Sequence, residues 1–115
     1  MSVTIYHNPK CSKSRQTLKL LEERGIQPTI IEYLRTPPSP ADLESILVLL
    51  KLEPRQLMRQ KEPEYQRSGA ADPDLGRDAL TKLMVQHPIL IERPIVLAND
   101  RAALGRPPEN VLAIL

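Results

Sequence analysis

The stretch that decides the fold is residues 3–33, VTIYHNPKCSKSRQTLKLLEERGIQPTIIEY. Residues 3–6 are apolar and predict a short buried strand. Residues 12–24 predict a helix, because leucines recur on one face and Gly25 follows where helices commonly end. The β-branched residues 29–33 predict a second strand. A strand, a helix and a strand within about 30 residues form a βαβ unit, whose strands are parallel with a right-handed crossover.

The middle of the chain has a helical pattern. Residues 36–38, Thr-Pro-Pro, break the chain, and Ser39 is a predicted N-cap with Pro40 at the first helical position. The apolar residues that follow have helical spacing: Leu43, Ile46, Leu47 and Leu50. A short helix at about residues 54–60 and another that ends at His87 complete a helical insertion at about residues 39–88.

The last third returns to strands. Residues 89–91, 95–97 and 102–104 are the predicted strands, with a turn at Asn99 and Asp100, and residues 107–115 predict a closing helix. This order predicts an α/β fold with a thioredoxin-like mixed sheet, βαβ followed by ββα, and a helical insertion between the two halves.

The overall composition limits the class of protein. A chain of 115 residues is expected to form one domain, residues 1–115, with a core of aliphatic side chains because Phe and Trp are absent. A formal charge of +2 does not indicate nucleic acid as a partner, and no apolar run approaches the roughly 20 residues of a membrane span. Two histidines and one cysteine give no metal-ligand pattern. We therefore expect a cytoplasmic monomer without a signal peptide, a metal or a bound cofactor.

Cys11 is the only cysteine, and it lies between the first strand and the first helix. The N-terminus of a helix favours an anion, so a thiol there is shifted toward the nucleophilic thiolate. Lys10, Lys13 and Arg15 add positive charge at a helix end where cations oppose the helix dipole. An ordinary buried cysteine would have apolar neighbours instead. The pattern predicts a reactive thiolate, and Arg15 is one of the groups expected to support it.

His7 and Ser14 are the other candidates for supporting the thiolate. The Ser14 hydroxyl lies one turn into the predicted helix, where it could donate to the sulfur, although an ordinary first-turn serine is an equal interpretation. His7 ends the first strand and could be a cationic or hydrogen-bonding neighbour, or could fill the strand end. A second cysteine at the position of Ser14 would be needed to resolve a mixed disulfide, so a redox cycle requires an external thiol.

Arg93 and Arg106 each precede a proline, which confines their backbone to extended conformations. Arginine side chains held in this way are suited to bidentate binding of a tetrahedral oxyanion, although most arginines are simply solvated surface residues. Arg59 has no such local signal.

Four sequence blocks resemble the glutaredoxin-linked arsenate reductases. These are residues 6–15 (YHNPKCSKSR), 32–38 (EYLRTPP), 86–96 (QHPILIERPIV) and 105–107 (GRP). Residues 8–15 are more similar to a chromosomal branch of that family than to the resistance enzymes. The resemblance implies a thioredoxin-related fold, Cys11 as nucleophile, and arginines that bind an oxyanion at Arg59, Arg93 and Arg106. It also implies that Pro94 is the cis proline found beside the active site of thioredoxin-like folds.

The resemblance further implies a mechanism. The Cys11 thiolate attacks arsenate, glutathione attacks the resulting adduct, and glutaredoxin reduces the mixed species with release of arsenite. Glutathione is then a co-substrate rather than a bound cofactor. Two alternatives are a regulator of the Spx type that binds RNA polymerase, and a protein similar to monothiol glutaredoxins. The first group often has Cys-x-x-Cys where this chain has Ser14, and the second has a different motif around its cysteine.

Overall fold

The computed structural model describes residues 2–115, which form two compact units. The first contains the described residues up to Thr36 together with Arg93–Leu115, and the second is Pro37–Glu92. The second unit therefore spans the segment for which the sequence predicts a helical insertion. Among residues 2–115, no helix has the length and apolar character needed to cross a membrane.

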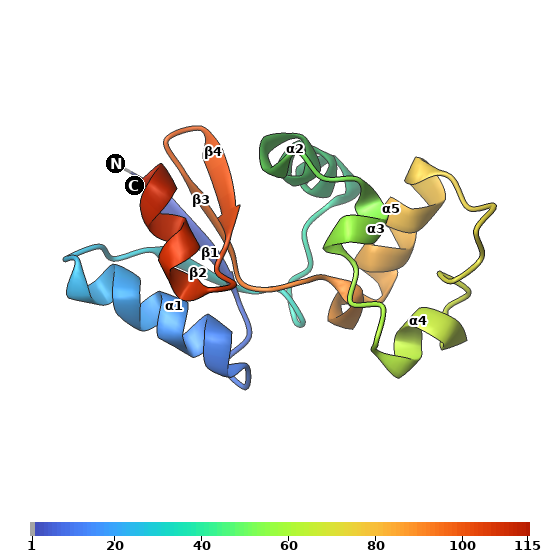
Figure 1. Ribbon diagram of the computed structural model, residues 1–115, viewed down its shortest axis with the longest axis horizontal. Helices are drawn as coiled ribbons and strands as arrows, with labels where there is room; N and C mark the ends of the chain where they lie inside the picture. The colour runs from blue at the N-terminus through green and yellow to red at the C-terminus, as the bar shows by residue number, and fades with distance from the viewer. Residues whose placement is uncertain (1) are drawn as a thin grey trace. The chain divides into compact units, whose positions relative to one another are not determined.

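The first unit contains a four-stranded mixed sheet (Figure 1). Its strands are β1 (Val3–His7), β2 (Thr29–Glu32), β3 (Ile95–Ala98) and β4 (Arg101–Leu104), in the order β2-β1-β3-β4. As predicted from residues 3–33, β1 and β2 are parallel. The β1–β3 and β3–β4 pairs are antiparallel. Asn99 and Asp100, both with positive φ, form the tight turn of the β3–β4 hairpin.

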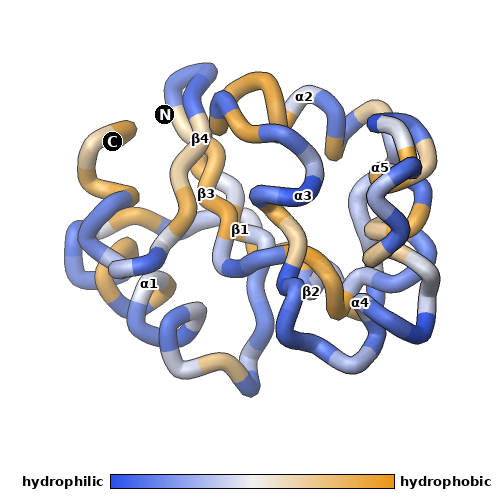
Figure 2. The backbone as a smooth tube through the Cα atoms, turned by 45° about the vertical axis from the view of Figure 1, so that its right-hand side comes forward, coloured by the Kyte–Doolittle hydropathy of each residue, from blue (hydrophilic) through white to orange (hydrophobic). Residues whose placement is uncertain are grey.

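Two helical segments pack on this sheet, namely α1 (Ser12–Glu23) and the 3₁₀ helix η2 (Pro108–Ile114). The core between them contains Ile5, Leu21, Val96 and Val111, all fully buried. Figure 2 shows the hydrophobic character of β3, which is a central strand of the sheet. Since burial of apolar area drives folding, this core holds α1 against the sheet.

The second unit is helical. It contains α2 (Pro40–Leu50), α3 (Pro54–Leu57), α4 (Pro63–Arg67), α5 (Arg77–Gln86) and the 3₁₀ helix η1 (Pro88–Leu90). Helices α2 and α3 both pack against α5. The predicted cap at Ser39 is confirmed, because its hydroxyl oxygen accepts a 3.1 Å hydrogen bond from the Asp42 backbone N–H. A core of aliphatic side chains lies between the helices, including Leu43, Leu47, Leu57 and Met84.

Residues 89–91 do not form the predicted strand. Residues Pro88–Leu90 form η1, and Ile91 makes a single isolated bridge with Met58. The Leu90 carbonyl accepts a 2.7 Å hydrogen bond from the Arg59 N–H. Leu90 and Ile91 are buried within the helical unit, which explains their apolar character without a strand in the sheet.

The segment at residues 61–76 contains the additional helix α4, which is not among the helices predicted from the sequence. The Arg55 guanidinium holds this segment from α3. Its Nη1 donates to the Tyr65 hydroxyl at 2.8 Å and to the Ala70 carbonyl at 2.6 Å. These bonds join residues 10 and 15 positions apart, so local sequence patterns do not contain them.

Candidate active site

The loop that carries Cys11 connects the end of β1 to the start of α1. The Cys11 N–H donates to the Asn8 carbonyl at 3.0 Å, and the Lys10 N–H donates to the Asn8 side-chain oxygen at 3.0 Å. Asn8 is buried, so both of its oxygens organise the turn from within. This tight turn places Cys11 at the N-cap position of α1.

The Cys11 sulfur therefore stands where the oxygen of Ser or Asp usually caps a helix. The Cys11 side chain makes no capping hydrogen bond of ordinary length, and the first turn of α1 holds no acidic residue. Partial burial raises the pKa of the Cys11 thiol. The backbone N–H of Ser14 and the Arg93 side chain lower it, and the Lys13 N–H adds a smaller effect in the same direction. Together these groups outweigh burial, so the net pKa is lowered. The predicted shift toward thiolate has thus two physical sources, the helix terminus and one guanidinium.

Arg93 and Arg106 reach the sulfur from the other half of the first unit. The Arg93 side chain acts on the Cys11 thiol both as a hydrogen-bonding group and as a positive charge, and it lowers the pKa of the thiol. The Nη1 of Arg106 lies 4.0 Å from the Cys11 Sγ and donates to the Arg93 carbonyl at 3.1 Å. Both arginines precede cis peptide bonds, to Pro94 and Pro107. The cis bond implied for Pro94 is confirmed, and the one at Pro107 was not expected.

His7, Ser14 and Asn8 form a buried polar cluster behind the loop. The Ser14 Oγ lies 2.6 Å from His7 Nδ1 and accepts a 3.0 Å hydrogen bond from the Asn8 N–H. Burial lowers the pKa of His7, although Glu32 acts to raise it, so the imidazole is neutral at pH 7. His7 thus contributes a hydrogen bond rather than a positive charge. In Ser14 it is the backbone N–H that acts on the sulfur, while its hydroxyl oxygen is bonded to His7 and Asn8.

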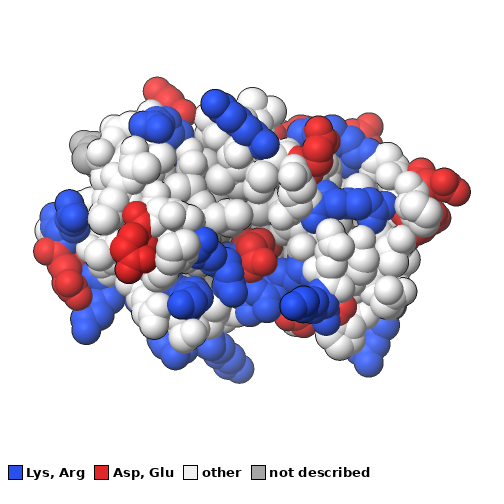
Figure 3. All heavy atoms as spheres, in the orientation of Figure 1, with Lys and Arg blue, Asp and Glu red and all other residues white. Residues whose placement is uncertain are grey.

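Arg15 acts on the loop rather than on the sulfur. Its Nη1 donates to the Pro9 carbonyl at 2.9 Å, which attaches the loop to the first turn of α1. Arg15, Lys10 and Lys13 are exposed. Figure 3 shows basic side chains at the lower left, where Figure 1 draws α1. The loop and the first turn of α1 on either side of Cys11 therefore expose positive charge, which attracts anions.

Gly105 is a positioning residue that was not predicted from the sequence. Its N–H donates to the Pro94 carbonyl at 2.9 Å. A Cβ atom added there would overlap Thr17 of α1 and lie 2.7 Å from the Pro94 Cγ. The absence of a side chain thus lets the chain before Arg106 lie directly against both α1 and the Pro94 loop. No local pattern indicates this contact, because the three residues are distant in sequence.

Arg59 belongs to the second unit. Its Nε donates to Glu62 at 3.1 Å and its Nη1 donates to Glu92 at 2.9 Å, so two carboxylates offset its charge. All three side chains are about one-quarter exposed or less. The role implied for Arg59 by resemblance stays a prediction.

The arrangement in the first unit is suited to nucleophilic attack on an oxyanion. A thiolate at a helix N-terminus is the attacking group, and two guanidinium groups beside it supply donors and positive charge. Among residues 2–115, no group of three or more His, Cys, Asp or Glu side chains has the placement of a metal site.

Comparison with known proteins agrees with this chemistry. The model of the ArsC family matches residues 6–114. The protein YfgD of Escherichia coli K12 is 52% identical over 98% of this chain and 96% of its own length. A protein named arsenate reductase from Neisseria meningitidis serogroup A is 50% identical over 98% of this chain and 97% of its own. The solved structure of an arsenate reductase from Vibrio cholerae has a TM-score of 0.96 and 55% identity, covering 100% of this chain and 98% of that one.

Proposed function

Because the chain belongs to the ArsC family, we propose that it is an arsenate reductase with Cys11 as its nucleophile. The observation that carries the proposal is the thiol of lowered pKa at the start of α1, with the Arg93 and Arg106 guanidinium groups beside it. Relatives about half identical over nearly the whole chain and named arsenate reductase support the choice of oxyanion.

The first step is attack on arsenic. Arsenate carries negative charge at neutral pH and repels a bare thiolate, so Arg93 and Arg106 bind its oxygens and offset that charge. The Cys11 sulfur then forms a bond to arsenic, and one arsenate oxygen takes up protons and leaves as water. The product is a thiol adduct in which arsenic is still pentavalent.

The remaining steps use external thiols, because the chain has only one cysteine. Glutathione binds arsenic through its sulfur, and a second oxygen leaves as water. A glutaredoxin thiolate attacks the glutathione sulfur and forms a disulfide with it, while the electron pair of the broken As–S bond stays on arsenic. Arsenic is now trivalent, and water displaces Cys11 to release arsenite. This dependence on reduced thiols favours the cytoplasm as the place of action.

Arg59 is the third oxyanion-binding arginine in this proposal. Its ion pairs with Glu62 and Glu92 hold the guanidinium in one position within the second unit. The carboxylates thus keep the side chain ordered before arsenate arrives.

A coupled assay tests the proposal. Arsenate, glutathione, glutaredoxin, glutathione reductase and NADPH are mixed with the wild-type protein or with Cys11→Ser. We expect NADPH oxidation that depends on arsenate, is lost in Cys11→Ser, and stops when either glutathione or glutaredoxin is omitted. An arsenate-dependent rate that is equal in Cys11→Ser would exclude Cys11 as the nucleophile. A rate that persists without glutaredoxin would show that another reductant serves this protein.

A further inference from the structure

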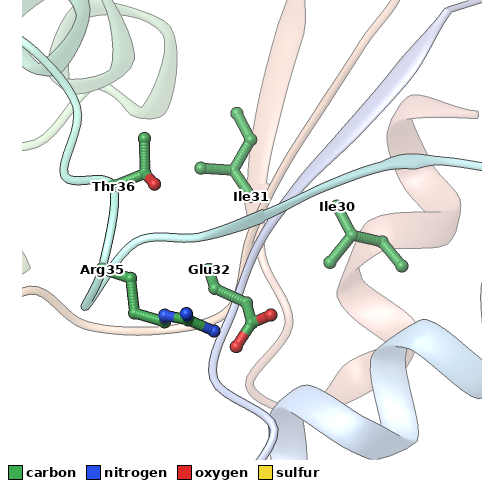
Figure 4. Close-up of a pocket in the computed structure, with 5 residues that line it drawn as sticks. All are labelled: Ile30, Ile31, Glu32, Arg35 and Thr36. Atoms are coloured by element: carbon green, nitrogen blue, oxygen red, sulfur yellow. The ribbon is translucent and has the colours of Figure 1, made fainter.

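A hollow at the free edge of the sheet in the first unit has no role in the chemistry above. Its volume is about 460 Å³, and it is lined by Ile30, Ile31, Glu32, Arg35 and Thr36 (Figure 4). This volume lies within the roughly 300–1,000 Å³ of sites that bind small molecules.

The hollow also lies near the end of the sheet at which the loop to Cys11 begins. Its residues come from β2 and from the turn that follows, where the N–H groups of Arg35 and Thr36 both donate to the Glu32 carbonyl at 2.9 Å. In the parallel β1–β2 pair, Glu32 is directly opposite His7, the last residue of β1. The loop to Cys11 begins at the next residue. Since the carboxyl ends of parallel strands lie at the same end of a sheet, the turn after β2 and the loop after β1 are neighbours.

The polar lining has two opposite charges. Figure 4 shows the Glu32 carboxylate and the Arg35 guanidinium extending to the same side of β2. Both side chains are exposed, and neither has an ion-pair partner closer than 4.0 Å within residues 2–115. A ligand with both an ammonium and a carboxylate group would complement these charges.

The backbone of β2 adds a second element of recognition. This strand is at the edge of the sheet, so alternate N–H and C=O groups face away from β1. An extended peptide binds such an edge by adding a strand, and side pockets then select its groups. Ile30, with 47% of its surface exposed, adds an apolar contact at the far end of the hollow.

We propose that this hollow is the docking site for the second substrate, a short zwitterionic peptide thiol of the glutathione type. Glu32 accepts hydrogen bonds from its ammonium group, Arg35 donates to a carboxylate, and its backbone lies along β2. The thiol is thereby held beside the Cys11 loop, where its sulfur forms a bond to the arsenic of the Cys11 adduct and one arsenic-bound oxygen leaves as water. This inference rests on the proposed function for its chemistry, but the docking itself is separately measurable.

Steady-state kinetics is the first test. Arg35→Gln should raise the KM for glutathione at least tenfold and leave the KM for arsenate and the rate at saturating glutathione within about twofold. Arg24→Gln is the matched control, because it removes the same charge from an exposed position at the other end of α1 and should change neither KM. An unchanged glutathione KM in Arg35→Gln would overturn the proposal while leaving the arsenate reductase activity in place.

Binding without turnover is the second test, and it does not depend on activity. S-methylglutathione cannot react, and in a two-dimensional NMR titration it should shift the amide signals of residues 30–36 in the wild type and much less in Arg35→Gln. An analogue of S-methylglutathione that lacks the ammonium group should bind the wild type more weakly than S-methylglutathione does. In Glu32→Gln the two compounds should bind equally, because the carboxylate that recognises the ammonium group is gone. Shifts confined to residues outside this segment, or no shifts, would contradict the inference even if arsenate is reduced.

Discussion

The Arg106 guanidinium joins two parts of the candidate site, because its Nη1 donates to the Arg93 carbonyl at 3.1 Å and lies 4.0 Å from the Cys11 sulfur. The hydrogen bond from Arg106 to the Arg93 backbone thus holds the Arg106 guanidinium beside the Cys11 thiol. Arg93, in turn, acts on the same thiol and lowers its pKa. The three residues form one geometric unit, so replacement of each has a distinct expected effect.

Arg106→Lys should weaken arsenate binding with little effect on the thiol. A lysine keeps the charge but lacks the planar set of donors that binds an oxyanion and the Arg93 carbonyl together. We expect the KM for arsenate to rise about tenfold. Because lysine keeps the positive charge near the sulfur, the pH profile of Cys11 alkylation should stay the same. A shifted profile with an unchanged KM would contradict this assignment.

Alkylation of Cys11 by iodoacetamide at different pH values should have a midpoint below the roughly 8.5 of a free thiol. The lowered pKa means that the thiolate is the form stabilised by folding. Its contribution to the free energy of unfolding is complete at pH values above the pKa of Cys11 in the unfolded chain. It is lost as the pH falls through the pKa of Cys11 in the folded protein. Arg93→Gln should raise the midpoint, because it removes both a hydrogen bond and a charge from the sulfur. A wild-type midpoint near 8.5 would remove the electrostatic basis of the mechanism.

Gly105→Ala should destabilise the protein by about 1–3 kcal/mol, the usual cost of forcing extra volume into a packed site. The new methyl group would overlap Thr17 and contact the Pro94 ring. Gly76→Ala is the control, since a Cβ there meets no atom within 4 Å. This change only replaces an N-cap glycine by the less favourable alanine, which should lower the free energy of unfolding by less than about 1 kcal/mol. Urea denaturation of both variants measures the difference. Equal losses would show that Gly105 is not close-packed in solution.

His7 should make the protein less stable in mild acid. Its pKa is lowered mainly by burial, so the unfolded chain binds a proton more readily than the folded one. The stability is therefore retained above the ordinary histidine pKa of about 6.5 and falls as the pH drops from there toward the folded pKa. His7→Asn should reduce this slope, and His87→Gln serves as the control for the other histidine. Identical slopes in the wild type and in His7→Asn would contradict the prediction.

Local patterns predicted much of the first unit. The alternation of strand and helix signals in residues 3–33 leads to one arrangement, because a parallel βαβ unit has one allowed handedness. The strand predicted at residues 89–91 was wrong because a short apolar run fits a buried strand and a buried helical turn equally well. Burial within the helical unit decided between them.

The candidate site was predictable to the extent that its chemistry is local. Cys11 could be placed at a helix start from its neighbours alone, and that placement is confirmed. The contact of Gly105 with Thr17 and Pro94 could not be predicted, because it depends on packing between segments far apart in the sequence. Likewise, the sequence does not reveal that the Ser14 hydroxyl is bonded to His7 while its backbone acts on the sulfur.

Direct speciation of arsenic tests whether Cys11 is required to reduce arsenate to arsenite. Arsenate is incubated with glutathione, glutaredoxin and either the wild-type protein or Cys11→Ser, and the arsenite formed is quantified by chromatography. The wild type should produce arsenite in excess of the amount of enzyme, and Cys11→Ser should produce no more than the mixture without enzyme. Equal arsenite from the wild type and from Cys11→Ser would contradict this requirement.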